Sequence, residues 1–138
     1  MKIKVLLLII ICLNSAYALT DRRILIQPES VSDEILKSMR DHLNATQEIL
    51  NAIIKNDMNT IARVSENRLG FKSLTTTSAS HNNMPFIPKV METLSLGLAQ
   101  SASELAIYAK NNEKEKLLPA LNKVMGYCVS CHNTYRIR

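Results

Sequence analysis

The chain lacks tryptophan and is poor in the residues that favour strands and tight turns. Its 138 residues include two Phe, four Tyr and three Gly. Leu, Ala, Ile, Lys, Glu and Asn predominate instead, and this composition favours helices over strands. The chain also has no internal repeat and no low-complexity segment. A single helical domain is the natural expectation for this length.

No apolar run is long enough to cross a membrane, which takes about 20 residues. The longest run, residues 5–13, follows a short basic start and precedes the small-x-small sequence Ala16-Tyr17-Ala18. This pattern predicts a cleaved secretory signal peptide over residues 1–18 and a mature domain over 19–138. We therefore expect a periplasmic protein without a membrane span in its mature chain. An uncleaved anchor, or a lipid on Cys12, is a weaker interpretation.

The charge pattern does not indicate a nucleic-acid partner. The formal net charge is +5, and the Lys and Arg residues are interleaved with acidic residues along the chain. A mixed, solvated surface explains such interleaving better than a basic patch does.

Two cysteines remain after the predicted cleavage, Cys128 and Cys131, and His132 follows them directly. Two thiols three residues apart with an adjacent histidine are typical of covalent haem attachment of the c type. Cys128 and Cys131 would form the thioethers, and His132 would ligate the iron. A structural disulfide is a poor alternative, because so short a loop adds little stability. A redox-active dithiol or a zinc site stays open, although no further ligand stands at a plausible spacing.

Apolar residues recur with a helical period in four stretches. We expect helices over about 32–55, from 58 past Gly70, over 88–109, and from a start within 112–118 to the end, with a loop at 75–88. Ser30 or Ser32 is the expected cap of the first helix, and Asn112 with Glu115 that of the last. Four helices with short connections predict an all-α, antiparallel four-helix bundle with the haem on its C-terminal helix.

The last stretch carries one continuous apolar seam. Its members are spaced 4, 3, 4, 3 and 4 residues apart: Leu117, Leu121, Val124, Cys128, Cys131 and Tyr135. A helix with this seam presents both thiols and His132 to one flat cofactor. Arg136, four residues beyond His132, is expected on the same face.

The segment Cys128-x-x-Cys131-His132-x-x-Tyr135-Arg136 resembles the haem motif of class II cytochromes c, the cytochrome c′ superfamily. The resemblance extends over the mature chain in helix number and order, and residues 39–43 add a weaker match. It implies one haem c with His132 as the proximal ligand and Arg136 beside the proximal pocket. It also implies that the first helix supplies the residue over the other face of the haem. That residue is apolar in high-spin members and methionine in the low-spin branch.

The sixth iron position has three candidate states. Met39 lies in the apolar stripe of the first helix, and a thioether there would favour ferrous iron. His42 would instead make the site bis-histidine, and with neither ligand the position stays open. The remaining methionines and histidine are expected to be core or loop residues: Met58, Met84, Met91, Met125 and the solvated His81. Tyr135 is expected to pack at the seam, with a hydrogen bond to a haem edge as the sharper hypothesis.

We therefore expect a mono-haem electron carrier that exchanges one electron with redox partner proteins and is not an enzyme. The resemblance leaves open whether it forms a homodimer. The first alternative is a haem protein that binds nitric oxide or carbon monoxide at an open sixth position. The second is a dithiol redox or metal-binding protein without haem.

Overall fold

A computed structural model describes residues 22–76 and 86–137, and these residues are mainly helical, which confirms the expected all-α class. The predicted signal peptide, His81 and Met84 lie outside the described residues. The elements are β1 (Arg23–Leu25), α2 (Glu29–Ile54), α3 (Met58–Val64), the π-helical η1 (Ser65–Leu69), α4 (Phe71–Thr76), α6 (Lys89–Lys110), α7 (Lys114–Thr134) and β2 (Tyr135–Ile137).

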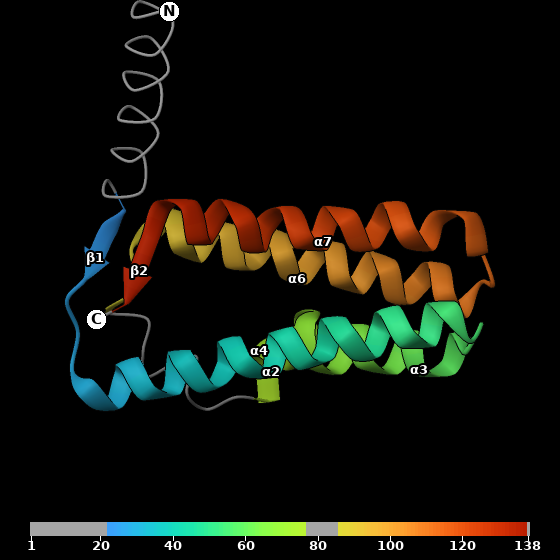
Figure 1. The fold of residues 1–138 in the computed structure, drawn as a ribbon, viewed down its shortest axis with the longest axis horizontal. Coiled ribbons are helices and arrows are strands. Elements are labelled where there is room, and N and C mark those ends of the chain that lie inside the picture. The colour runs from blue at the N-terminus through green and yellow to red at the C-terminus, as the bar shows by residue number, and fades with distance from the viewer. Residues whose placement is uncertain (1–21, 77–85, 138) are drawn as a thin grey trace, which may run out of the picture.

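The long helices lie along one axis, with α6 and α7 side by side and α2 next to α3 (Figure 1). α3 packs against both α2 and α6, and so joins the two halves of the fold. The connections after α2 and after α6 lie at one end, and β1 and β2 lie at the other (Figure 1).

The hydrophobic core fills one end of this assembly. α2 contributes to it from Ala45 onward, and α7 contributes only as far as Val124. The fully buried members include Ile49, Ile61, Leu105 and Leu117. No residue is buried at 36–44 of α2, 89–98 of α6 or 125–134 of α7. The three long helices therefore share a level near the strands at which none of their described residues is buried.

Two of the expected helix caps are wrong. α2 begins at Glu29, because the carbonyl of Pro28 already accepts hydrogen bonds from the N–H groups of Val31 and Ser32, each at 3.0 Å. Before α7, Asn112 adopts the left-handed conformation with φ of 57°. Glu113 is consequently the N-terminal cap, and its side chain makes no capping hydrogen bond.

The second helical stretch follows the expected boundaries but not the expected geometry. It begins at Met58, where the carboxylate of Asp57 accepts a hydrogen bond from the Thr60 N–H at 3.0 Å. The Gly70 N–H bonds the Ser65 carbonyl at 2.7 Å and closes the wider turn of η1, and α4 continues the stretch past Gly70 to Thr76. Such π-helical turns are uncommon and often lie at functional sites.

The end of α7 differs from the prediction. Tyr135 was expected on the helical seam, but the helix ends at Thr134 and Tyr135 has the extended φ of −125°. Tyr135 pairs with Arg23 in a parallel ladder, and Arg136 pairs with Ile24. The segment before Pro28 provides the partner strand. Arg136 therefore does not lie one helical turn above His132.

Gly97 of α6 gives a prediction about packing between α6 and α7. A Cβ atom at Gly97 would lie 2.4 Å from Cε1 of the Tyr127 ring, whereas a Cβ at Gly126 would meet nothing within 4 Å. We expect G97A to lower the free energy of unfolding by about 1–2 kcal/mol, because overpacking outweighs the gain in helix propensity. G126A, the matched control, should raise it by about 0.5–1 kcal/mol. Urea unfolding measures both, and a stabilised G97A would contradict the close contact.

Asp57 gives a prediction about pH. Hydrogen bonds from the Thr60 side chain and then its backbone N–H hold the pKa of Asp57 below its ordinary 3.8. The ionised cap therefore stabilises the fold above that pH, and its contribution is lost as the pH falls through the lowered value. We expect D57A to lower the urea midpoint at pH 7 and to lose part of that difference by pH 3. D57N keeps a capping oxygen without a charge, so its urea midpoint should differ less from that of the parent. An equal difference for D57A at both pH values would argue against an ionised cap.

Candidate functional site

The residues of the predicted attachment motif lie in the last two turns of α7. Cys128 and Cys131 are free thiols and are half-buried, whereas His132 is exposed. The Cys128 thiol donates to the Val124 carbonyl at 3.7 Å. The structure thus keeps Cys128, Cys131 and His132 within one helical turn, as the spacing predicts.

One side of α7 is in contact with α6. Tyr127 lies against the backbone of Gly97, and the Lys123 ammonium pairs with Glu104 at 2.8 Å. About half a helical turn away, α7 carries Leu118, Met125, Val129 and His132 at spacings of 7, 4 and 3 residues. The three apolar members are 57%, 40% and 54% exposed. This stripe of α7 therefore faces away from α6.

α2 is arranged in the same way. Asp41 and Glu48 lie on the side that contacts η1, where both pair with Arg68. The opposite side of the helix carries a second apolar stripe, formed by Leu36, Met39, Leu43, Leu50 and Ile54. Leu43 is 62% exposed and Ile54 is 71% exposed, while Met39 is half-buried. This stripe thus has no partner on α3 or η1.

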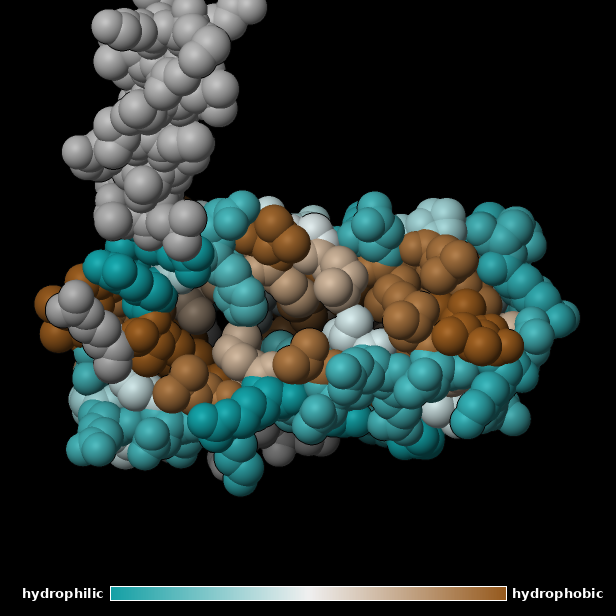
Figure 2. All heavy atoms as spheres, in the orientation of Figure 1, coloured by the Kyte–Doolittle hydropathy of each residue, from teal (hydrophilic) through white to brown (hydrophobic). Residues whose placement is uncertain are grey.

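We call the surface between these two stripes the α2–α7 seam. It is distinct from the apolar seam of α7 itself, and it is bordered by the α7 stripe that ends at His132 and by the α2 stripe that contains Met39. Figure 2 shows apolar side chains gathered between α2 and α7 on this face of the molecule. It also shows the face hollowed between the N-terminal half of α2 and the C-terminal half of α7. The hollow coincides with the level at which residues 36–44 and 125–134 include no buried side chain.

The seam carries possible iron ligands on both of its walls. Cys128, Cys131 and His132 belong to the α7 wall, and Met39 and His42 belong to the α2 wall. Met39 lies in the stripe that faces the seam, whereas His42 is turned about 60° around α2 toward the core side. The predicted ligands therefore lie near the middle of α2 and in the last two turns of α7.

His42 has a pKa below the ordinary 6.5 of histidine. Burial lowers its pKa, and this effect outweighs the opposing influence of Asp41, while Arg68 adds to the lowering. Its Nε2 lies 3.5 Å from the Ser38 hydroxyl. A neutral imidazole is the form that can coordinate a metal.

The two thiols are not activated nucleophiles. Burial raises the pKa of Cys128, and burial together with the neighbouring Cys128 raises the pKa of Cys131. Reactive dithiols require the opposite shift, produced by nearby positive charge or a helix N-terminus. This pair is instead half-buried and lies near a helix C-terminus.

Two buried donors directly after the C-terminus of α7 have no hydrogen-bond partner among the described residues. They are the Tyr135 hydroxyl and the Arg136 Nε, both in β2. A buried donor without an acceptor costs about 1–3 kcal/mol. An anionic group at this end would therefore be stabilised by Tyr135 and Arg136.

The remaining methionines have different surroundings. Met58 packs against the main core, as expected, and Met91 is half-buried on α6. Met125 is 40% exposed on the α2–α7 seam and is not a core residue as expected. The 4-3 spacing could have identified its stripe, since Met125, Val129 and His132 share it.

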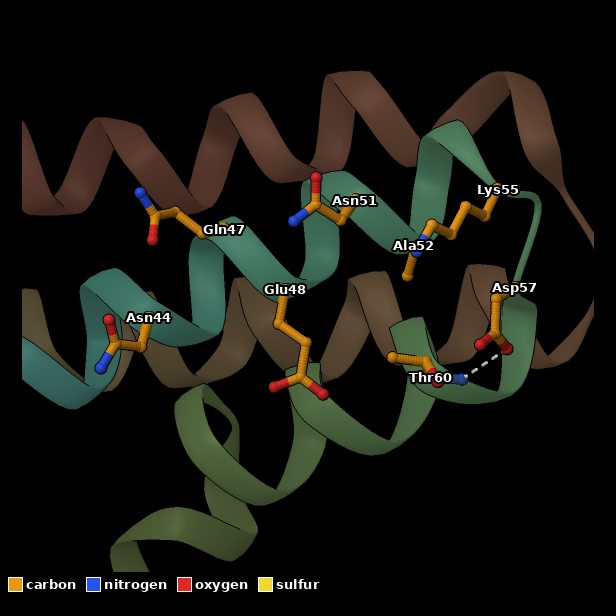
Figure 3. A pocket seen from close by; sticks show the side chains of 8 residues that line it. All are labelled: Asn44, Gln47, Glu48, Asn51, Ala52, Lys55, Asp57 and Thr60. Atoms are coloured by element: carbon orange, nitrogen blue, oxygen red, sulfur yellow. Dashed lines mark hydrogen bonds between the residues drawn. The ribbon is translucent and has the colours of Figure 1, made fainter.

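A second hollow lies between α2 and α3 and has a volume of about 400 Å³ (Figure 3). Its lining is mostly polar: Asn44, Gln47, Glu48, Asn51, Ala52, Lys55, Asp57 and Thr60. None of the predicted site residues lines it. Figure 3 shows the carboxylate of Glu48 pointing from α2 toward the second helical stretch. Glu48 pairs there with Arg63 at 2.9 Å and with Arg68 at 2.8 Å.

Within residues 22–76 and 86–137, no three His, Cys, Asp or Glu side chains group closely enough to hold a metal ion. In the same part of the chain, no helix combines the length and the apolar character that crossing a bilayer requires.

Comparisons with protein-family models, with curated proteins and with solved structures find no match to this chain.

Proposed function

We propose that the chain is an antiparallel four-helix bundle that carries one haem c in the α2–α7 seam and serves as an exported one-electron carrier. One observation carries this proposal. The predicted attachment motif lies on α7 at the level where residues 36–44, 89–98 and 125–134 include no buried side chain, and Figure 2 shows the face hollowed between α2 and α7. A flat, apolar macrocycle has the shape and the chemistry to complete that level.

Each residue of the α7 wall has a separate task. Cys128 and Cys131, three residues apart on one helical face, hold the ring by two bonds and fix its orientation. His132, on the seam side of the same turn, provides the proximal nitrogen. When bound, the haem iron supplies a reversible one-electron change between its ferric and ferrous states. The apolar stripes of α2 and α7 exclude water from it.

The α2 wall provides the candidate ligands for the face of the iron opposite His132. Met39 is the candidate sixth ligand that the geometry favours, because it lies in the stripe facing the seam. His42 is the alternative, and its lowered pKa keeps it available as a neutral ligand. A thioether ligand would raise the haem potential relative to a second imidazole.

Tyr135 and Arg136 suit the carboxylate edge of the cofactor. Their buried donors have no partner among the described residues, and haem propionates are anionic acceptors. A charge-assisted hydrogen bond to such an acceptor is stronger than one between neutral groups.

The alternatives are supported less well. A dithiol redox protein would need a lowered thiol pKa, and both pKa values are raised. A zinc site would need Cys128, Cys131 and His132 to converge, and they form no such group. Binding of nitric oxide or carbon monoxide differs from electron transfer only in the sixth position, so the ligand test below separates the two.

Replacing the two cysteines tests the attachment. We expect C128A/C131A to lose all covalently retained haem after acid–acetone extraction, when expressed with a haem-attachment system. S130A is the matched control, because Ser130 lies between the two cysteines in the sequence and its hydroxyl donates to the Gly126 carbonyl of the same helix at 2.8 Å. It should retain haem fully. A parent chain without covalent haem would refute the proposed function.

Replacing Met39 tests the sixth ligand. We expect the ferrous parent to be low-spin and unchanged by carbon monoxide, and M39L to become high-spin and to bind it. M91L, on α6, should match the parent, and so should H42Q. Conversion by H42Q and not by M39L would show bis-histidine ligation. A parent that binds carbon monoxide at once would favour the gas-binding function. Absorption spectra of the purified proteins measure each outcome.

A further inference from the structure

Arg68 of η1 makes an extensive set of contacts with α2. Its Nε donates to Asp41 Oδ2 at 3.1 Å, and its Nη2 donates to Asp41 Oδ1 and to the Asp41 backbone carbonyl, the latter at 3.0 Å. Its Nη1 donates to Glu48 Oε2 at 2.8 Å. The side chain is only 26% exposed. One guanidinium thus holds two turns of α2 through side chains and backbone together.

These contacts hold the part of α2 that the core does not. No residue between Ile35 and Ala45 is buried, so apolar packing does not fix the rotation of α2 there. Asp41 lies in the middle of this stretch, two residues after Met39 and next to His42. The planar fork of arginine fixes direction as well as distance when it pairs with a carboxylate in this way.

Asp41 and Met39 lie on nearly opposite sides of α2. Residues two apart on a helix are separated by about 200°. A contact that holds Asp41 against η1 therefore sets how far Met39 projects into the α2–α7 seam. With side chains extending about 5–6 Å from the axis, a rotation of about 20° would move the Met39 tip by about 2 Å. A functional site needs its groups held to roughly 0.5 Å.

We propose that Arg68 is a positioning residue for the sixth coordination position of the haem. It acts through Asp41 on the rotation of α2 and so determines which α2 side chain stands over the iron. The inference rests on the proposed function and extends it to a residue that touches neither the attachment motif nor the seam.

Arg63 provides a matched control. It pairs with Glu48 through one bond at 2.9 Å, is 58% exposed and makes no contact with Asp41 among the described residues. Its loss removes a positive charge from the same interface of α2 with the second helical stretch. The loss of Arg63 leaves the contact between Arg68 of η1 and Asp41 of α2 in place.

The experiment compares R68M, R68K, R63M and the parent as holoproteins. Haem content, ferrous spectra, melting temperature and the rate of carbon monoxide binding are measured for each. We expect R68M to keep its covalent haem but, unlike the parent, to contain high-spin ferrous haem that binds carbon monoxide, so that its binding rate exceeds that of the parent by roughly tenfold or more. R68K should recover part of the parent behaviour, because lysine keeps the charge without the fork. R63M should match the parent. D41N, which weakens the same contact from the α2 side, should shift the spectrum in the direction of R68M.

The outcomes separate the two proposals. A parent without covalent haem overturns the proposed function and this inference together. A parent with haem, and an R68M variant with the spectrum and carbon monoxide rate of R63M, overturns the inference alone. A lower melting temperature in R68M with an unchanged spectrum and carbon monoxide rate would show that Arg68 has a purely structural role. That outcome also overturns the inference. If the parent iron is five-coordinate, the same tenfold change in rate is expected, since the α2 wall then controls access to the open face.

Discussion

The structure depends on a constraint at one level of its interior. Three long helices run through that level, and none of them buries a side chain there at residues 36–44, 89–98 or 125–134. Protein interiors are normally close-packed, so an assembly that leaves apolar stripes apart must complete them with something else. The attachment motif stands at this level on α7, and Met39 stands there on α2. The haem that we propose would serve both as a redox centre and as part of the core at this level.

Periodicity alone predicted much of this arrangement. The helical spacing of apolar residues located the four helical stretches, and the Cys128-x-x-Cys131-His132 spacing predicted three adjacent side chains on α7. What periodicity could not predict depends on partners far away in the chain. Tyr135 fits the 4-3 pattern of α7, but backbone pairing with Arg23 draws it into a strand. The cap at Pro28 was missed because its carbonyl, and no side chain, accepts the first hydrogen bonds.

Arg68 shows the same limit for the candidate site. As a charged residue in a helical stretch, it carries no signal of its own in the sequence. Its importance comes from the π-helical turn that contains it, closed by the Gly70–Ser65 bond, and from Asp41, which lies far earlier in the chain. Gly97 is similar, because only the Tyr127 ring on the next helix explains why a side chain is excluded there. Local patterns identify what a helix can present, and long-range contacts decide where it is presented.

The β1–β2 pair has a kinetic consequence. Its strands come from opposite ends of the described chain, so closing the ladder costs the entropy of nearly the whole chain as one loop. Contacts of such long sequence separation form late in folding. The helices can assemble before Tyr135 docks beside Arg23, and until then the last turns of α7 stay open at one end. The motif is therefore expected to remain accessible to covalent chemistry through most of folding, and to be enclosed only when the final strand settles.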